Sequence, residues 1–276
     1  MPTPKQTFYD VLTAAVEDLA ENGFDSVERV ERWTRALRLA AVGATTRPEE
    51  LDQMLREGLA SVYRRLVEDG GIFRQNPGVS RFTLAQVKPR LRAELDRRIM
   101  ASASLIKLNR EQAIDKTIQR FQGWATSIPK GGSAEPEKAT TKKNVRKSLA
   151  QLPFEERRVL IDQGTKLSAS LSKILATDGG AIAGRWRHHH VTYPRPEHVA
   201  RDGVVFLIRD SWADQKGFVK PQKGAGYTDD IEEPGEFVFC RCSYVYLYAL
   251  RDLPKSMLTV KGSSALDEAR AAAAAM

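Results

Sequence analysis

The chain has 276 residues, of which 42% are hydrophobic and 28% charged, and its formal net charge is +8. This length suits one large domain or two smaller ones, and the composition is that of a protein with a buried core. No apolar run approaches the roughly 20 residues that cross a bilayer, and the first residues lack the pattern of a secretory signal. We therefore expect no membrane span, and a protein that is made and kept in a cytoplasm.

Residues 1–128 are predicted to form a helical domain. Three stretches that begin near Phe8, Asp25 and Pro48 repeat apolar residues at the spacing of one buried helix face. Thr46 is the expected N-cap of the third stretch, because an acidic residue follows it three positions later. Short connections between these helices predict antiparallel neighbours in a bundle.

A longer helical pattern follows and continues to about Trp124. It begins near Thr83 or, if Pro89 marks its first turn, near Lys88. At 1.5 Å per residue this helix would be a rod of roughly 50 Å, longer than most globular helices. Such a helix either projects from or spans an assembly, or it is the central helix of a bundle.

Residues 129–150 are rich in Gly, Pro and Lys without an apolar pattern, which predicts a flexible linker between two domains. Positive charge is concentrated nearby, since residues 83–150 contain 15 Lys and Arg but only 6 Asp and Glu. A basic strip can bind the phosphates of double-stranded DNA without reading its sequence. The expected contacts are Lys138, Lys142, Lys143, Arg146 and Lys147. A solvated helix face with a soluble linker is the alternative.

Residues 151–262 are predicted to form a small α+β domain. Pro153 is expected in the first turn of its helix. Residues 204–208 form a short apolar run typical of a buried strand, and residues 237–248 have the β-branched and aromatic content of an unusually long strand that pairs with it. The alanine-rich tail, residues 263–276, is a short helix candidate with little to bury.

All four histidines and both cysteines lie between residues 186 and 248. On a strand, Cys240 and Cys242 would point to the same face, with Cα atoms roughly 6.6 Å apart, at the far limit of disulfide geometry. Two reduced thiols or a shared metal are therefore expected. Structural zinc takes four N or S ligands, which predicts a site made of His190, His198, Cys240 and Cys242. The alternative is two reduced, half-buried cysteines and a solvated histidine run.

The same segment resembles a known protein family. An Arg-Pro-x-His sequence is followed, in order, by a Gly, a Trp, Pro-Gly and Cys-Arg-Cys. These residues are Arg195, Pro196, His198, Gly203, Trp212, Pro234, Gly235, Cys240, Arg241 and Cys242. The ordered set resembles the phage Mu F-like head morphogenesis family, which are minor head proteins of tailed bacteriophages. It covers roughly residues 155–250, and the triple histidine and the loop after Trp212 depart from the family pattern.

The resemblance implies a minor structural protein of a virion head rather than an enzyme. Members of this family are implied to sit in few copies at or near the portal vertex and to contact the portal or major capsid protein. They assemble in the host cytoplasm, and some contact or accompany packaged DNA. The whole chain, including residues 109–129, resembles a narrower group of phage structural proteins with this domain at the C-terminus.

Two other classes of function remain open. A Cys-His pair with nearby carboxylates such as Asp202 and Asp210, or a zinc with an open position, would suit a virion-associated hydrolase or nuclease. However, the sequence has no phosphate-binding Gly loop, no HExxH and no GxSxG, so no catalytic residue is assigned. The third class is a soluble DNA-binding protein with no place in the virion.

Overall fold

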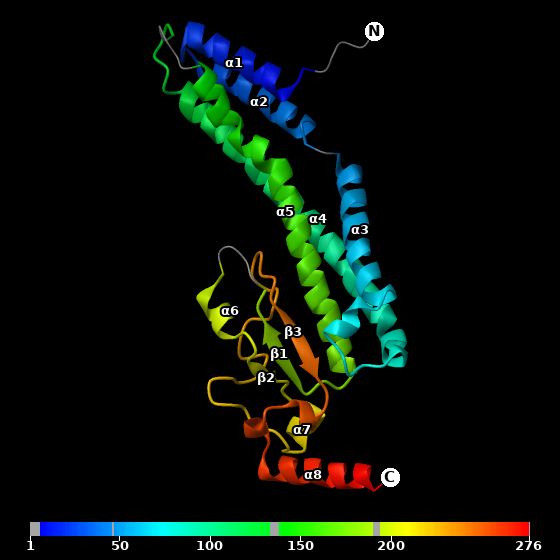
Figure 1. The fold of residues 1–276 in the computed structure, drawn as a ribbon. Coiled ribbons are helices and arrows are strands. Elements are labelled where there is room, and N and C mark those ends of the chain that lie inside the picture. The colour runs from blue at the N-terminus through cyan, green and yellow to red at the C-terminus, as the bar shows by residue number, and fades with distance from the viewer. Residues whose placement is uncertain (1–5, 46, 133–137, 190–193, 276) are drawn as a thin grey trace. The chain divides into compact units, whose positions relative to one another are not determined.

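The computed structural model describes residues 6–45, 47–132, 138–189 and 194–275. Within these residues the chain is mostly helical, with a small three-stranded sheet near its C-terminal end (Figure 1). Two compact units are present, and each is made of two segments of the chain. Unit 1 comprises Met1–Leu55 and Met100–Val159, and unit 2 comprises Arg56–Ile99 and Leu160–Met276. The predicted class, helices followed by a small α+β region, is confirmed in this coarse form. The predicted domains were continuous segments of the chain, whereas each observed unit combines two segments.

The first two helices form in the stretches for which the apolar periodicity predicts them. Helix α1 spans Phe8–Asn22 and helix α2 spans Val27–Gly43. A capping box begins α1: the Thr7 hydroxyl accepts from the N–H of Asp10, and the Asp10 carboxylate accepts from the N–H of Thr7. The core of unit 1 is built on the fully buried faces of these helices.

Helix α3 spans Pro48–Tyr63, which confirms the third predicted helix, while its expected cap Thr46 lies outside the described residues. A π-helical turn, Arg64–Glu68, and a 3-10 turn, Gly71–Arg74, follow it. Helix α4 spans Arg81–Ala125 and contains Pro89 in its third turn, so the later of the two predicted starts is wrong. This helix supplies buried residues to the core of each unit, such as Leu91 in unit 2 and Phe121 in unit 1.

Helix α5 spans Lys138–Asp178, so the flexible linker predicted for residues 129–150 is wrong from Lys138 onward. Pro153 lies inside this helix instead of starting it. The reason is an apolar face that is sparse in sequence, in which Val145 and Leu152 are buried, Leu149 is partly buried, and the other residues between them are small or polar. Lys and Arg are good helix formers, so tertiary burial of this thin face is enough to hold the helix.

The sheet has the order β2-β1-β3, and both pairings are antiparallel. Strand β1 spans Ala183–Arg187, β2 spans Val205–Leu207 and β3 spans Ser243–Leu247. The short strand predicted at 204–208 is confirmed, but the long strand predicted at 237–248 is wrong before Ser243. Strand β1 lies between the other two (Figure 1), so the expected pairing of the two predicted strands is also wrong.

The remaining elements are short. They are α6 Pro196–Ala200, α7 Trp212–Gln215, the 3-10 turns Leu250–Asp252 and Lys255–Met257, and α8 Val260–Ala274. The alanine-rich tail is helical as predicted, and α8 is exposed along most of its length. In the part of the chain that the structure describes, no helix is both long enough and apolar enough to cross a membrane.

Candidate metal centre

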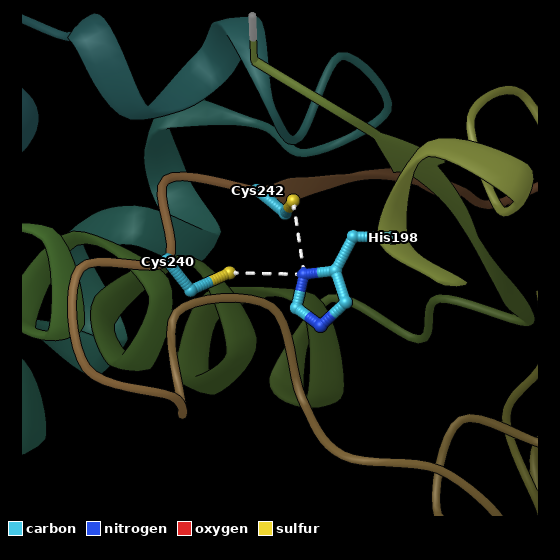
Figure 2. A group of neighbouring side chains, drawn as sticks. All are labelled: His198, Cys240 and Cys242. Carbon is cyan, nitrogen blue, oxygen red and sulfur yellow. Dashed lines mark hydrogen bonds between the residues drawn. The ribbon is translucent and has the colours of Figure 1, made fainter. Parts of the chain in front are cut away.

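Three of the four predicted metal ligands meet in unit 2. The Nδ1 atom of His198 lies 3.5 Å from the Cys240 sulfur and 3.6 Å from the Cys242 sulfur. Figure 2 shows both thiols on the Nδ1 side of the imidazole ring. All the potential ligand atoms lie within 4.8 Å of one another, and the three residues are only 2%, 4% and 5% exposed. The arrangement can hold a metal ion.

The single turn of α6 places His198. Pro196 starts the helix, and the N–H of His198 donates to the carbonyl of Arg195 at 3.1 Å. On the far side of the ring, Nε2 lies 3.1 Å from Oε1 of Glu232. With Nε2 protonated and donating to that carboxylate, the lone pair of Nδ1 faces the thiols, which is how proteins orient a metal-binding histidine.

Glu232 is held as a carboxylate. Its burial raises the pKa, but the hydrogen bond from Arg201, a backbone N–H and the nearby cationic groups together lower the pKa below its usual value. An ionised carboxylate is the stronger acceptor for the His198 N–H. Arg201 also stacks over the ring of Trp186, so the same guanidinium links Glu232 to strand β1.

A loop rather than a strand carries the two cysteines. Phe239 has a φ of +60°, a left-handed conformation that is strained for an aromatic residue. The N–H of Phe239 donates to Oδ1 of the buried Asp162 at 2.6 Å, and Nη2 of Arg195 donates to the carbonyl of Val238 at 3.1 Å. These two anchors fix the turn that directs both thiols to His198.

The pKa values of the two thiols are shifted in opposite directions. The hydrogen bond from Cys242, aided by the N–H of Gly235 at 3.4 Å and opposed by burial, lowers the pKa of Cys240 to about 5. The same hydrogen bond and burial raise the pKa of Cys242. A metal ion would bind both sulfurs in their deprotonated form, because the thiolate is the form that binds metal.

One buried donor beside Cys242 has no hydrogen-bond partner among the described residues. This donor is the indole N–H of Trp186, and it lies where it favours the thiolate of Cys242. The ring of Trp186 also packs edge-on against His198, with centroids 5.3 Å apart. A metal-bound sulfur at Cys242 would give this N–H an acceptor. One imidazole and two thiolates form a donor set that suits zinc.

The structure describes two of the three residues of the histidine run. His190, the fourth predicted ligand, lies outside the described residues. His188 is half-buried, and its N–H donates to Oδ1 of Asp202 at 2.9 Å. His189 is exposed and lines the same cavity as Cys242. Asp202 and Asp210, the carboxylates considered for catalysis, do not join the cluster of potential ligand atoms in the described residues.

Sequence reasoning missed the residues that support the ligands. Glu232 and Asp162 sit in segments with no motif, and Asp162 is 77 residues from its partner Phe239. Trp186 opens the histidine- and cysteine-rich segment, but an isolated Trp has no spacing that would mark it as a neighbour of a thiol. No pattern along the chain could have found these three, because each acts through a contact formed only by the fold.

The residues predicted to bind nucleic acid lie at the start of α5, in unit 1. They are Lys138, Lys142, Lys143, Arg146 and Lys147. The charged groups of Lys142 and Arg146 lie 5.7 and 5.4 Å from the ring centre of Tyr9, which is 47% exposed. Lys143, Arg146 and Lys147 are exposed, so the structure gathers the predicted residues on one helix.

Comparisons of the chain with protein-family models, with curated proteins and with solved structures find no match.

The anchor of the cysteine loop gives a stability prediction. In Asp162→Ala, the N–H of Phe239 and the ammonium of Lys166, 3.0 Å from the carboxylate, both lose their partner. We expect the free energy of unfolding, measured by urea denaturation, to fall by about 1–3 kcal/mol. In the control Asp96→Ala, which removes an exposed partner of Arg92, we expect a change within about 0.5 kcal/mol. Equal effects would mean that Asp162 does not anchor the loop.

Proposed function

We propose that this chain is a minor structural protein of a tailed-phage head, with a structural zinc in its C-terminal α+β region. The observation that carries this proposal is the convergence of His198, Cys240 and Cys242 in one buried cluster. The protein would act in head morphogenesis at or near the portal vertex, in several copies, against the portal or major capsid protein. The resemblance to Mu F-like head proteins supplies this setting.

Zinc would be held by Nδ1 of His198 and the sulfurs of Cys240 and Cys242, with the fourth ligand from the run 188–190, where His190 is our candidate. The ion would cross-link α6 to the loop that leads into β3. Strands of 3 to 5 residues bury little, so such a cross-link is a large share of the stability of this region. Glu232 would keep the imidazole oriented.

Three further residues of the family resemblance help to build this cluster. Arg195 holds the carbonyl of Val238, Pro196 starts α6, and the N–H of Gly235 donates to the sulfur of Cys240. Gly235 has a φ of +85°, a conformation that glycine adopts without strain. The motif therefore has a physical purpose in building the site, which supports the use of the resemblance.

A structural role fits the burial better than a catalytic one. A catalytic zinc keeps a position open to water and substrate, whereas a structural zinc takes all its ligands from the protein. The ligand residues are almost fully buried, and the second nitrogen of the imidazole is engaged by Glu232. We therefore place the hydrolase or nuclease alternative second.

Metal content tests the zinc site. We expect about one zinc per chain by elemental analysis, and a lower melting temperature when a chelator removes it. His198→Ala, Cys240→Ser and Cys242→Ser should each lose the zinc and the chelator response. Ser263→Ala, an exposed change on α8, should keep both. A full-length protein that contains no metal and melts identically with chelator would refute the site.

Virion composition tests the assigned setting. In a phage that encodes this chain, we expect it to co-purify with heads in few copies, and to cross-link to portal or major capsid protein. A phage lacking the chain should yield fewer infectious particles with normal capsid synthesis. Absence of the chain from purified heads, together with normal particle yield, would contradict the structural role.

The start of α5 is our proposed surface for double-stranded DNA. Its cations follow one another along the exposed part of a helix, and Tyr9 lies between two of them. Regularly spaced Lys and Arg contact phosphates without reading bases, and each contact releases counterions. This is the behaviour expected of a head protein that touches packaged DNA of any sequence.

Salt dependence measures these contacts. Changing Lys143, Arg146 and Lys147 together to Gln should weaken DNA binding and reduce the slope of log affinity against log salt by about 0.9 per lost contact. Fluorescence anisotropy with a labelled duplex at several salt concentrations gives this slope. The control changes an equal number of exposed lysines in unit 2, Lys220, Lys223 and Lys255. An unchanged slope in the α5 variant would place DNA elsewhere or exclude it.

A further inference from the structure

Unit 2 contains an open cavity of about 630 Å³ beside the metal centre. Its walls come from the end of α3 with the π-helical turn, from the part of α5 that belongs to unit 2, and from the loop that carries Cys242. This volume falls in the range of cavities that hold small organic ligands, roughly 300–1,000 Å³. Neither the zinc proposal nor the virion setting uses this space.

The charged groups that line the cavity are all basic. Arg65 and Arg241 contribute guanidinium groups, while no Asp or Glu is among the described residues of its walls. Neither guanidinium has an ion-pair partner in the part of the chain that the structure describes, whereas Arg201 and Arg209, also in unit 2, are paired with carboxylates. The cavity therefore has an excess of positive charge without a counter-charge of its own.

The rest of the lining is apolar with a few hydroxyl groups. Val62, Leu160 and Ile161 form an aliphatic side, and the Ile161 side chain remains 56% exposed. Ser168 and Ser243 add hydroxyl groups to the lining. A ligand that fits this lining carries a strong anion and a flat or apolar body.

We infer that this cavity binds a phosphate monoester attached to an apolar ring system, as in a nucleotide or the 5′-phosphorylated end of a nucleic-acid strand. Two planar guanidinium groups can donate several parallel hydrogen bonds to one phosphate, and the dianion matches two positive charges where a carboxylate matches one. The aliphatic side covers the face of a base. Arg241 lies between the two cysteines, so the anchored loop fixes its backbone.

This site differs from the DNA surface at the start of α5. The α5 surface lies in unit 1 and offers exposed cations along a helix, so it suits internal phosphodiesters along a duplex. The cavity instead suits a terminal phosphate, which carries more charge and projects from its strand. The inference stands whether or not the chain belongs to a phage head.

Isothermal titration of the full chain tests the inference with adenosine 5′-monophosphate, adenosine and inorganic phosphate. We expect saturable binding of the nucleotide, with adenosine and inorganic phosphate each at least tenfold weaker. Arg65→Gln and Arg241→Gln should each weaken nucleotide binding roughly tenfold, the loss of about 1.4 kcal/mol from a charge-assisted contact. Arg251→Gln, an exposed change in unit 2 outside the cavity, should leave the affinity unchanged.

A short oligonucleotide with a 5′-phosphate, compared with the same strand ending in a 5′-hydroxyl, identifies the source of the phosphate. Binding that requires the 5′-phosphate and both arginines supports a strand end, and nucleotide binding without oligonucleotide binding supports a free nucleotide. Equal affinity for adenosine or for inorganic phosphate would overturn the inference. So would nucleotide affinity that both arginine variants leave unchanged, or no binding of either probe. Because Arg65 lies outside the cysteine loop, its variant stays informative if Arg241→Gln alters folding.

Discussion

Two thiols and an imidazole buried within 4.8 Å of one another set the constraint on which unit 2 depends. Buried groups that bind and release protons at such distances are stable only if their charges are balanced. The hydrogen bond between Cys240 and Cys242 provides a partial balance, because it lowers the pKa of Cys240 and raises that of Cys242. A divalent cation would balance two thiolates, and the thiolate of Cys242 could then accept from the N–H of Trp186. The three side chains can therefore hold a metal ion.

Contacts from elements far apart in the sequence stabilise the strained backbone of this arrangement. The left-handed turn at Phe239 is held by Asp162 on α5 and by Arg195 at the start of α6. Glu232 fixes the imidazole from a third segment. Each contact gives a backbone or ring group a hydrogen-bond partner, so loss of one is expected to loosen the rest. A sheet with strands this short depends on such cross-links.

Positive charge is organised in two different ways in the two units. At the start of α5 it forms an exposed row, in which the cations are separated along a helix and Tyr9 lies among them. In unit 2 it forms the basic side of a cavity, where Arg65 and Arg241 have no acidic partner among the described residues. The first geometry favours the backbone of a long polyanion and the second a single terminal group. Both fit a protein that works beside nucleic acid, as the proposed place in a phage head requires.

The sequence by itself determined the helices with dense apolar faces and the residue types of the metal cluster. Helices α1 to α4 follow their periodicity, and the collection of His and Cys in one segment marked His198, Cys240 and Cys242. Only the tertiary structure decided the helix from Lys138, the strand β1 and the loop in place of a long strand. The first part of α5 has few apolar residues on its buried face, so this segment is helical only when tertiary packing buries that face. In β1, Gly184 lies against the ring of Tyr244, a contact that no local pattern encodes. Short-range periodicity records which face is buried, whereas the partners of a buried polar group depend on which distant segments the fold brings together.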